Sequence, residues 1–143
     1  MMNIYERNFS RLVKLNIINE KGELQFKEAF KIKRKGLMSL NLDFLRSDEK
    51  GSYVIAIAHN YEQHGDIMAD PDMEIKVFPE VHMIEALTYQ QDNMNIYQVV
   101  YPEPGKVNPR AKKELNGFLE TWLKNLIDQG FKLQQEKGTC EEC

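Results

Sequence analysis

The longest regular pattern of apolar residues lies between Asn108 and Gly130, where they recur every three or four positions. This spacing predicts an amphipathic helix that buries one face against the rest of the protein. The predicted helix begins at Asn108, which can accept hydrogen bonds from first-turn amides, followed by Pro109, and it ends at Gly130 in a left-handed conformation. The apolar face consists of Leu115, Phe118, Leu119, Trp122, Leu123, Leu126 and Ile127.

The rest of the chain contains a second helical pattern and several alternating ones. Apolar residues at helical spacing predict a short helix from Met1 to about Ile18. Segment 24–32 mixes apolar residues with charges and fits either a strand or an irregular connection. The polar segment 62–72 is expected to be a long hairpin loop between two strands. Alternation of apolar and polar residues predicts strands at 38–44, 53–61, 73–77, 83–89 and 95–101.

This order of elements predicts an α+β fold, with an antiparallel meander sheet of four to five strands. The N-terminal helix and the long C-terminal helix are expected to pack on one face of that sheet. Residues 1–133 would form a single domain, and residues 134–143 a flexible tail. The small side chains of Val54, Ala56 and Ala58 suggest that this face of the second strand receives the long helix, with Trp122 buried against it. The opposite face, or a groove at its edge, is then left for function.

Composition narrows the classes of partner. With 143 residues and 42% hydrophobic content the chain fits one compact domain. Its 19 basic and 22 acidic residues give a formal charge of -3, which argues against nucleic acid as a partner. The basic cluster from Lys27 to Lys35 is interpreted as protection of a strand edge. No segment resembles a signal peptide or a membrane span, which predicts a cytoplasmic protein without a membrane partner.

Several segments resemble the YqiB-like family of small bacterial proteins of unknown function. The run from Tyr5 to Leu12 is similar to its N-terminal helix, and the run from Met73 to Ala86 to its central hairpin. Tyr101-Pro102 and the run from Phe118 to Gly130 are similar to its C-terminal segment. The resemblance implies a fold class and a cytoplasmic bacterial setting, and it implies no reaction. The family's hairpin turn often carries an aromatic residue, a histidine and an aspartate, where this chain has Phe78, Pro79 and Glu80.

A candidate metal site is formed by His59, His64, Asp66 and Asp70, because imidazole and carboxylate groups are ligands for zinc, manganese or iron. Their spacing matches no known ligand motif, and the alternative is ordinary turn chemistry within a hairpin loop. A candidate ligand groove is lined by Tyr61, Tyr89 and Tyr97, whose alternative role is at the periphery of the core.

Cys140 and Cys143 form a C-x-x-C motif near the C-terminus. A structural zinc site needs four ligands, and this motif supplies two thiolates. The motif is expected to be a reduced tail, and its alternative is a metal shared between two chains. No cofactor is expected elsewhere.

No nucleophile and base share a recognisable motif, which favours a non-catalytic binding or regulatory module over an enzyme. Its site would be the exposed sheet face or the 62–72 loop, and its partner an unidentified protein or small molecule. The alternative is a metal-dependent hydrolase that uses His59, His64, Asp66 and Asp70.

Overall fold

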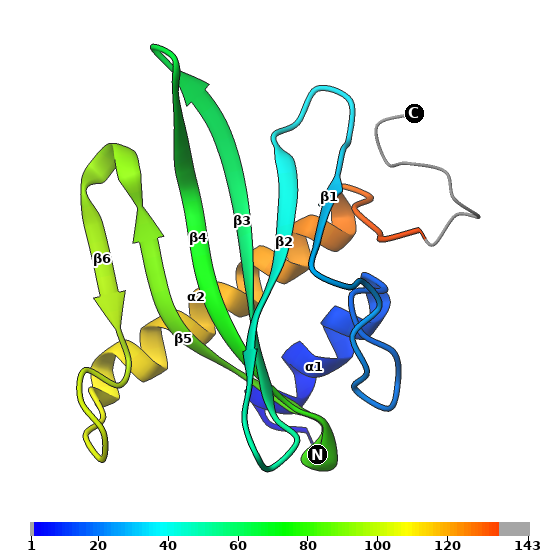
Figure 1. The fold of residues 1–143 in the computed structure, drawn as a ribbon, viewed down its shortest axis with the longest axis vertical. Helices are drawn as coiled ribbons and strands as arrows, with labels where there is room; N and C mark the ends of the chain where they lie inside the picture. The colour runs from blue at the N-terminus through cyan, green and yellow to red at the C-terminus, as the bar shows by residue number, and fades with distance from the viewer. Residues whose placement is uncertain (1, 135–143) are drawn as a thin grey trace.

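The computed structural model describes residues 2–134, apart from the side chains of residues 62, 63 and 67–69. Its central feature is an antiparallel sheet with α1 and α2 behind it (Figure 1). The 3-10 turns η1 and η2 connect strands. In chain order the elements are α1 (Ile4–Lys14), β1 (Ala29–Ile32), β2 (Ser39–Ser47), β3 (Tyr53–Gln63), β4 (Asp66–Phe78), η1 (Pro79–Val81), β5 (Met83–Gln91), η2 (Asp92–Met94), β6 (Ile96–Val99) and α2 (Pro109–Asp128).

The predicted α+β meander is confirmed, but within the described residues the sheet has six strands rather than four to five. Each strand pairs with the next in the chain, in the order β1 to β6. The additional strand is β1, inside the segment that the sequence left open. Phe30 lies opposite Leu42 and Ile32 opposite Leu40, while Lys31 points to the other face. Within β1 the charged Lys31 therefore alternates with the apolar Phe30 and Ile32.

The polar segment 62–72 is not a long loop, and this expectation was wrong. β3 and β4 continue as paired strands to Gln63 and Asp66, so that the connection is the dipeptide His64-Gly65. Both residues have positive φ angles, 54° and 86°, as a two-residue type I′ hairpin turn requires. Glycine adopts this conformation without strain, and the turn lets the hairpin extend well beyond the rest of the sheet (Figure 1).

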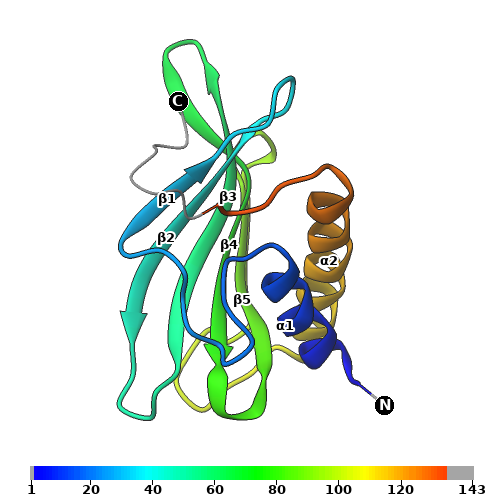
Figure 2. The ribbon, with the colours of Figure 1, turned by 90° about the vertical axis from the view of Figure 1, so that its right-hand side faces the viewer.

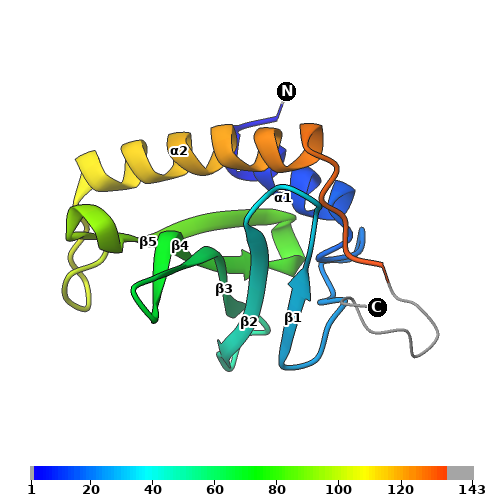
Figure 3. The same cartoon turned by 90° about the horizontal axis from the view of Figure 1, so that it is seen from above.

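The helices cover one face of the sheet and leave the other open (Figures 2 and 3). The core lies between them, where Ile57 of β3 stands opposite Leu42 and Met73. All of these side chains are fully buried, as are Leu119 and Leu123 of α2. Such apolar burial is the main source of stability for this layer arrangement.

Trp122 is buried as expected, with 6% of its surface exposed, but it packs on the other face of β3. Its ring lies 5.6 Å from that of His59 and 6.1 Å from that of Phe118. Val54, Ala56 and Ala58 lie on the open face instead. Because side chains alternate along a strand, the pattern of small residues alone could not identify the face that the helix covers.

The ends of α2 follow the predicted rules. Asn108 is the N-cap, and its side chain accepts a hydrogen bond from the amide of Ala111 at 3.1 Å. Pro109 is the first helical residue, and Gly130 adopts the left-handed conformation just after the helix, with φ 85°. α1 begins with a capping box, in which Asn3 and Glu6 exchange side chain to backbone hydrogen bonds.

Candidate functional site

The open face of the sheet carries rows of residues that the strand register defines. One row crosses the sheet from Arg46 through Val54 and Lys76 to Glu85. The neighbouring row contains Ala56 with polar residues on both sides. Since α1 and α2 cover the opposite face, these side chains form a surface that is accessible to a ligand (Figure 2).

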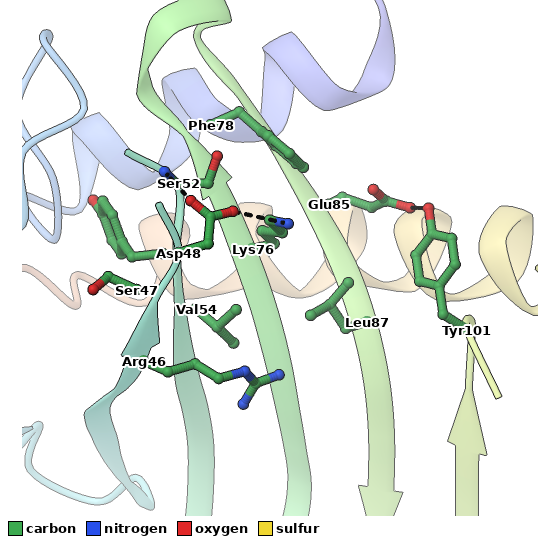
Figure 4. A pocket seen from close by; sticks show the side chains of 11 residues that line it. Arg46, Ser47, Asp48, Ser52, Val54, Lys76, Phe78, Glu85, Leu87 and Tyr101 are labelled. Carbon is green, nitrogen blue, oxygen red and sulfur yellow. Dashed lines mark hydrogen bonds and ion pairs between the residues drawn. The ribbon is translucent and has the colours of Figure 1, made fainter. Parts of the chain in front are cut away.

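A hollow of about 380 Å³ lies on this open face, at the end of the sheet where β2 turns into β3. Its size is within the range of small-molecule sites in proteins. Val54 and Leu87 occupy the middle of the hollow in Figure 4, and polar side chains surround them. The lining residues are Arg46, Ser47, Asp48, Ser52, Tyr53, Val54, Lys76, Phe78, Glu85, Leu87 and Tyr101.

Asp48 forms one wall of the hollow, where the β2–β3 turn fixes its orientation. Its carboxylate accepts hydrogen bonds from the amides of Lys50 at 2.9 Å and Ser52 at 3.0 Å. It also pairs with the Lys76 ammonium at 3.4 Å. Desolvation acts to raise the pKa of Asp48, but these donors outweigh it and lower the pKa below its ordinary value. Asp48 is therefore an ionised acceptor at neutral pH.

The cations of the hollow also have partners within the sheet. The Arg46 guanidinium lies 3.5 Å from a carboxylate oxygen of Glu74, and both side chains are substantially exposed. The Lys76 ammonium lies 5.2 Å from the ring centroid of Phe78, within the range of a cation–π contact. Exposed pairs of this kind contribute little to stability, so Arg46 and Lys76 can exchange these partners for a ligand with a small loss of free energy.

The opposite wall is formed by Glu85 and Tyr101. Both contact Lys112, and this cluster joins the end of β6 to α2. The Tyr101 hydroxyl donates a short hydrogen bond to Glu85 (Figure 4). The Lys112 ammonium donates to the Tyr101 oxygen at 3.3 Å and lies 3.4 Å from Glu85. Desolvation raises the pKa of Tyr101, and its bond to Glu85 raises it further, so the phenol remains protonated at neutral pH.

A second hollow, of about 240 Å³, adjoins this cluster where α1 and α2 meet the edge of β5. It shares Phe78 and Glu85 with the first hollow. The cluster therefore separates two adjacent depressions. The lining residues of the second are Tyr5, Phe78, Met83, Ile84, Glu85 and Lys112.

The middle of the open face is acidic. Asp72 stands next to Ala58 on the neighbouring strand and is half-buried. Desolvation raises the pKa of Asp72, and the nearby charges of Glu74, Asp43 and Asp92 raise it further. The surface beside the hollow is therefore acidic, whereas the hollow itself also contains the cations Arg46 and Lys76.

The predicted metal ligands occupy different parts of the β3–β4 hairpin. His59 is on the helix-covered face, where its ring packs 5.6 Å from those of Trp122 and Phe131, and its Nδ1 lies 3.1 Å from the Ser39 carbonyl oxygen. Burial lowers the pKa of His59 despite the opposing effects of Ser39 and Asp70. The ring is therefore neutral at pH 7 and serves as part of the aromatic packing.

His64 is exposed in the hairpin turn, and Asp66 is exposed at the first position of β4. Asp70 is close enough to His59 to influence its pKa. Among the residues that the structure describes, no three His, Cys, Asp or Glu side chains are grouped to hold a metal ion. The metal assignment therefore stays a prediction without geometric support.

The predicted tyrosines do not share one groove. Tyr89 lies on the helix-covered face, with its ring 5.1 Å from that of Phe118 and its hydroxyl bonded to Gln91. Tyr97 is opposite Gln90 on the open face of β6 and is 62% exposed. Tyr61 is half-buried on the extended part of β3. Their assignment as ligand residues also stays a prediction.

Sequence reasoning missed the residues that line the hollow. Arg46, Lys76 and Glu85 come from separate strands, and their alignment depends on bulges at positions 44–46 and 74–75. The available signal was the turn sequence from Asp48 to Gly51, because aspartate commonly accepts from amides two residues further on. Cys140 and Cys143, with the rest of the predicted tail after Gln134, lie outside the described residues.

Comparison with protein-family models gives a match over residues 7–132, which include all the residues that line the larger hollow. The chain belongs to the family described as a domain of unknown function, DUF6908. Neither the comparison with curated proteins nor that with solved structures gave a match. Within the described part of the chain, neither helix combines the length and apolar character needed to cross a membrane.

Proposed function

We propose that this chain is a non-catalytic binding module that takes a small ligand in the hollow on its open sheet face. The observation that carries the proposal is this hollow of about 380 Å³, on the face that the helices leave open. Its middle is apolar, from Val54 and Leu87, and its rim carries polar groups (Figure 4). This distribution is typical of small-molecule sites, in which apolar contact supplies affinity and polar groups supply orientation.

The charges of the rim favour a ligand that carries both signs. Arg46 and Lys76 contribute two positive charges, and Asp48 and Glu85 contribute two negative ones. Because these charges balance, the hollow has no strong attraction for a simple anion or cation. A zwitterion with an apolar body, such as an amino acid or a dipeptide, would place its carboxylate near Arg46 and its ammonium near Glu85.

The ionisation of the rim supports recognition rather than proton transfer. A raised pKa keeps Tyr101 a hydrogen-bond donor, and a lowered pKa keeps Asp48 an acceptor. A general base or acid works best with a pKa near the working pH, and both shifts lead away from neutrality.

Titrations followed by two-dimensional 1H–15N NMR test the proposal with three related probes. Leucyl-leucine carries both charges, N-acetyl-leucine carries the negative one, and leucinamide carries the positive one. We expect leucyl-leucine, at about 10 mM or below, to shift the amide signals of Ser52, Val54 and Leu87. The singly charged probes should bind at least about tenfold more weakly, since each lacks one of the ionic contacts.

A matched pair of variants locates the binding. Leu87→Trp fills the hollow and should abolish the shifts, whereas Leu37→Trp, at an exposed position between β1 and β2, should leave them unchanged. Circular dichroism confirms that each variant is folded. The proposal fails if none of the probes shifts these amides, or if Leu87→Trp binds leucyl-leucine as the unmodified protein does.

The finer expectations from the sequence stay proposals. They are a specific relationship to the YqiB-like family, a bacterial and cytoplasmic setting, and a regulatory role for the bound ligand. The metal-dependent hydrolase on His59, His64, Asp66 and Asp70 also stays a prediction.

A further inference from the structure

The free edge of β6 is unusual for a sheet edge in its lack of charge. In Figure 1 β6 forms the left-hand border of the sheet, and no helix or strand of the described residues lies beyond it. The segment from Asn95 to Tyr101 contains no charged residue, no proline and no glycine. Edge strands commonly carry lysine or proline, which discourage pairing with another chain. The uncharged composition of β6 instead favours pairing with a strand of another chain.

The backbone of β6 presents hydrogen-bonding groups away from the sheet. The amide of Val100 donates to the carbonyl of Leu87 on β5 at 2.9 Å. Backbone groups alternate in direction along an antiparallel strand, and the register of β5 with β6 is regular from Gln91 to Thr88. Tyr97 and Val99 therefore direct their N–H and C=O groups outward, where a further strand can bind.

The two edges of the sheet differ in how they would meet a second copy. β1 has Lys31 within it and Lys27 and Lys33 beside it, all exposed. In a symmetric contact each edge meets itself, so that the lysines of β1 would face one another and repel. The uncharged edge of β6 has no such repulsion. This difference in charge favours a second copy of the chain as the occupant of the β6 edge.

We propose that β6 pairs antiparallel with β6 of a second copy, around a twofold axis at Gln98. In this register Tyr97 lies opposite Val99 of the second copy, and their outward backbone groups form hydrogen bonds in both directions. Tyr97, which is 62% exposed, gains an apolar neighbour on the open face. Gln98 lies directly opposite its counterpart on the other face, in the closer type of antiparallel pair.

The pairing makes one sheet continuous across two copies and extends the open face. A contact through a short strand buries less surface than a standard stable interface, so the dimer should be weak. We expect a dissociation constant between about 10 µM and about 1 mM. The pairing is independent of the proposed ligand, so either proposal can fail without the other.

Sedimentation velocity over protein concentrations from about 1 µM to about 1 mM tests the pairing. Gln98→Lys and Gln98→Glu each place like charges directly opposite one another, and each alone should weaken association about fivefold or more. An equimolar mixture of the two variants should restore association, because opposite charges then meet. Added salt should weaken the mixed pair.

Gln129→Lys and Gln129→Glu make the same changes at an exposed residue just after α2. The C-terminal end of α2 lies near β1, across the sheet from β6 (Figure 1). These controls should associate as the unmodified protein does. A protein that keeps the monomer mass at the highest concentration would overturn the proposal. Full association of both Gln98 variants alone, or no recovery in their mixture, would also overturn it.

Discussion

Asn116 is a polar residue buried inside the core. It lies within α2 on the buried face, with 1% of its surface exposed. Its side-chain oxygen accepts from the amide of Ala86 at 2.9 Å, and its amide nitrogen donates to the Lys112 carbonyl at 2.7 Å. Asn8 of α1 donates to the Asn116 carbonyl. Asn116 therefore provides a hydrogen-bond acceptor for a backbone amide of β5 at a point where β6 no longer pairs with that strand. Through these bonds it connects β5 and α1 to α2.

We predict that Asn116→Ala lowers the free energy of unfolding by about 1 to 3 kcal/mol. The substitution leaves the buried N–H of Ala86 without its acceptor, which is the larger part of the expected loss. Urea unfolding followed by circular dichroism measures the effect. Asn125→Ala, at an exposed position of the same helix, is the control and should change stability by less than about 0.5 kcal/mol. Equal effects of the two substitutions would contradict this account.

At the residue scale the sequence predicts apolar burial well and polar burial poorly. Leu119, Trp122 and Leu123 were expected in the core because their spacing places them on one face of α2. Asn116 and Asn8 have the same burial, yet a polar residue gives no periodic signal of its own. Their partners come from distant parts of the chain, and only the folded arrangement identifies them.

At the scale of elements, Glu120 of α2 connects the two helices. Its carboxylate lies 2.9 Å from Arg7 and 2.8 Å from Arg11 of α1. The hydrogen bond from Arg7 is the largest cause of a lowered pKa for Glu120, burial opposes it, and Arg11 lowers the pKa further. Since α1 has few turns of its own, its position depends on such contacts together with its apolar face.

This connection predicts a pH dependence of stability. Glu120 has a lower pKa in the folded than in the unfolded state, so its contribution is present above the ordinary glutamate pKa of 4.5. The contribution is lost as the pH falls through the folded pKa, because the protonated acid no longer pairs with Arg7 and Arg11. Glu120→Gln should therefore cost about 1 kcal/mol at pH 7 and almost nothing in strong acid.

Urea unfolding of the unmodified protein and of Glu120→Gln at several pH values measures the difference in their free energies of unfolding. The matched control is Glu114→Gln, whose partner Arg110 lies one turn away on the exposed face of α2. This exposed pair should contribute less than about 0.5 kcal/mol at any pH. A stability gap for Glu120→Gln that stays constant into strong acid would show that the loss does not come from the carboxylate charge.

Helices and strands were predicted best where apolar residues recur at regular spacing. α2 was predicted with its caps, since the apolar spacing and the residues at both ends agree. The β3–β4 hairpin was mistaken for a loop because its polar residues obscured the alternation and the turn is short. The hollow was not predictable, because β-bulges set which residues of β2, β4 and β5 lie side by side.

At the scale of the whole molecule, the segment after α2 returns to the core and meets the end of α1. Phe131 and Leu133 are almost fully buried. The amide of Leu133 donates to the Leu15 carbonyl at 2.9 Å, and the Asn16 side chain donates to the Leu133 carbonyl at 3.2 Å. Segments from the two ends of the sequence thus stabilise one another, and the fold depends on residues beyond its last helix.

Two shortened chains test this dependence. A chain that ends after Gln134 keeps both buried side chains and should melt within a few degrees of the 143-residue chain, since residues 135–143 contain little apolar surface. A chain that ends after Gly130 loses Phe131 and Leu133, and each large buried side chain contributes roughly 2 to 5 kcal/mol.

Small domains have a total stability of about 5 to 15 kcal/mol, so the chain ending after Gly130 should melt far lower or fail to fold. Thermal unfolding by circular dichroism distinguishes these outcomes, and Phe131→Ala in the 143-residue chain should give an intermediate loss. If the chain that ends after Gly130 melted like the 143-residue chain, the contacts of Phe131 and Leu133 would contribute little, and the domain would end with α2. A large loss in the chain ending after Gln134 would instead place part of the folded domain beyond the predicted boundary at residue 133.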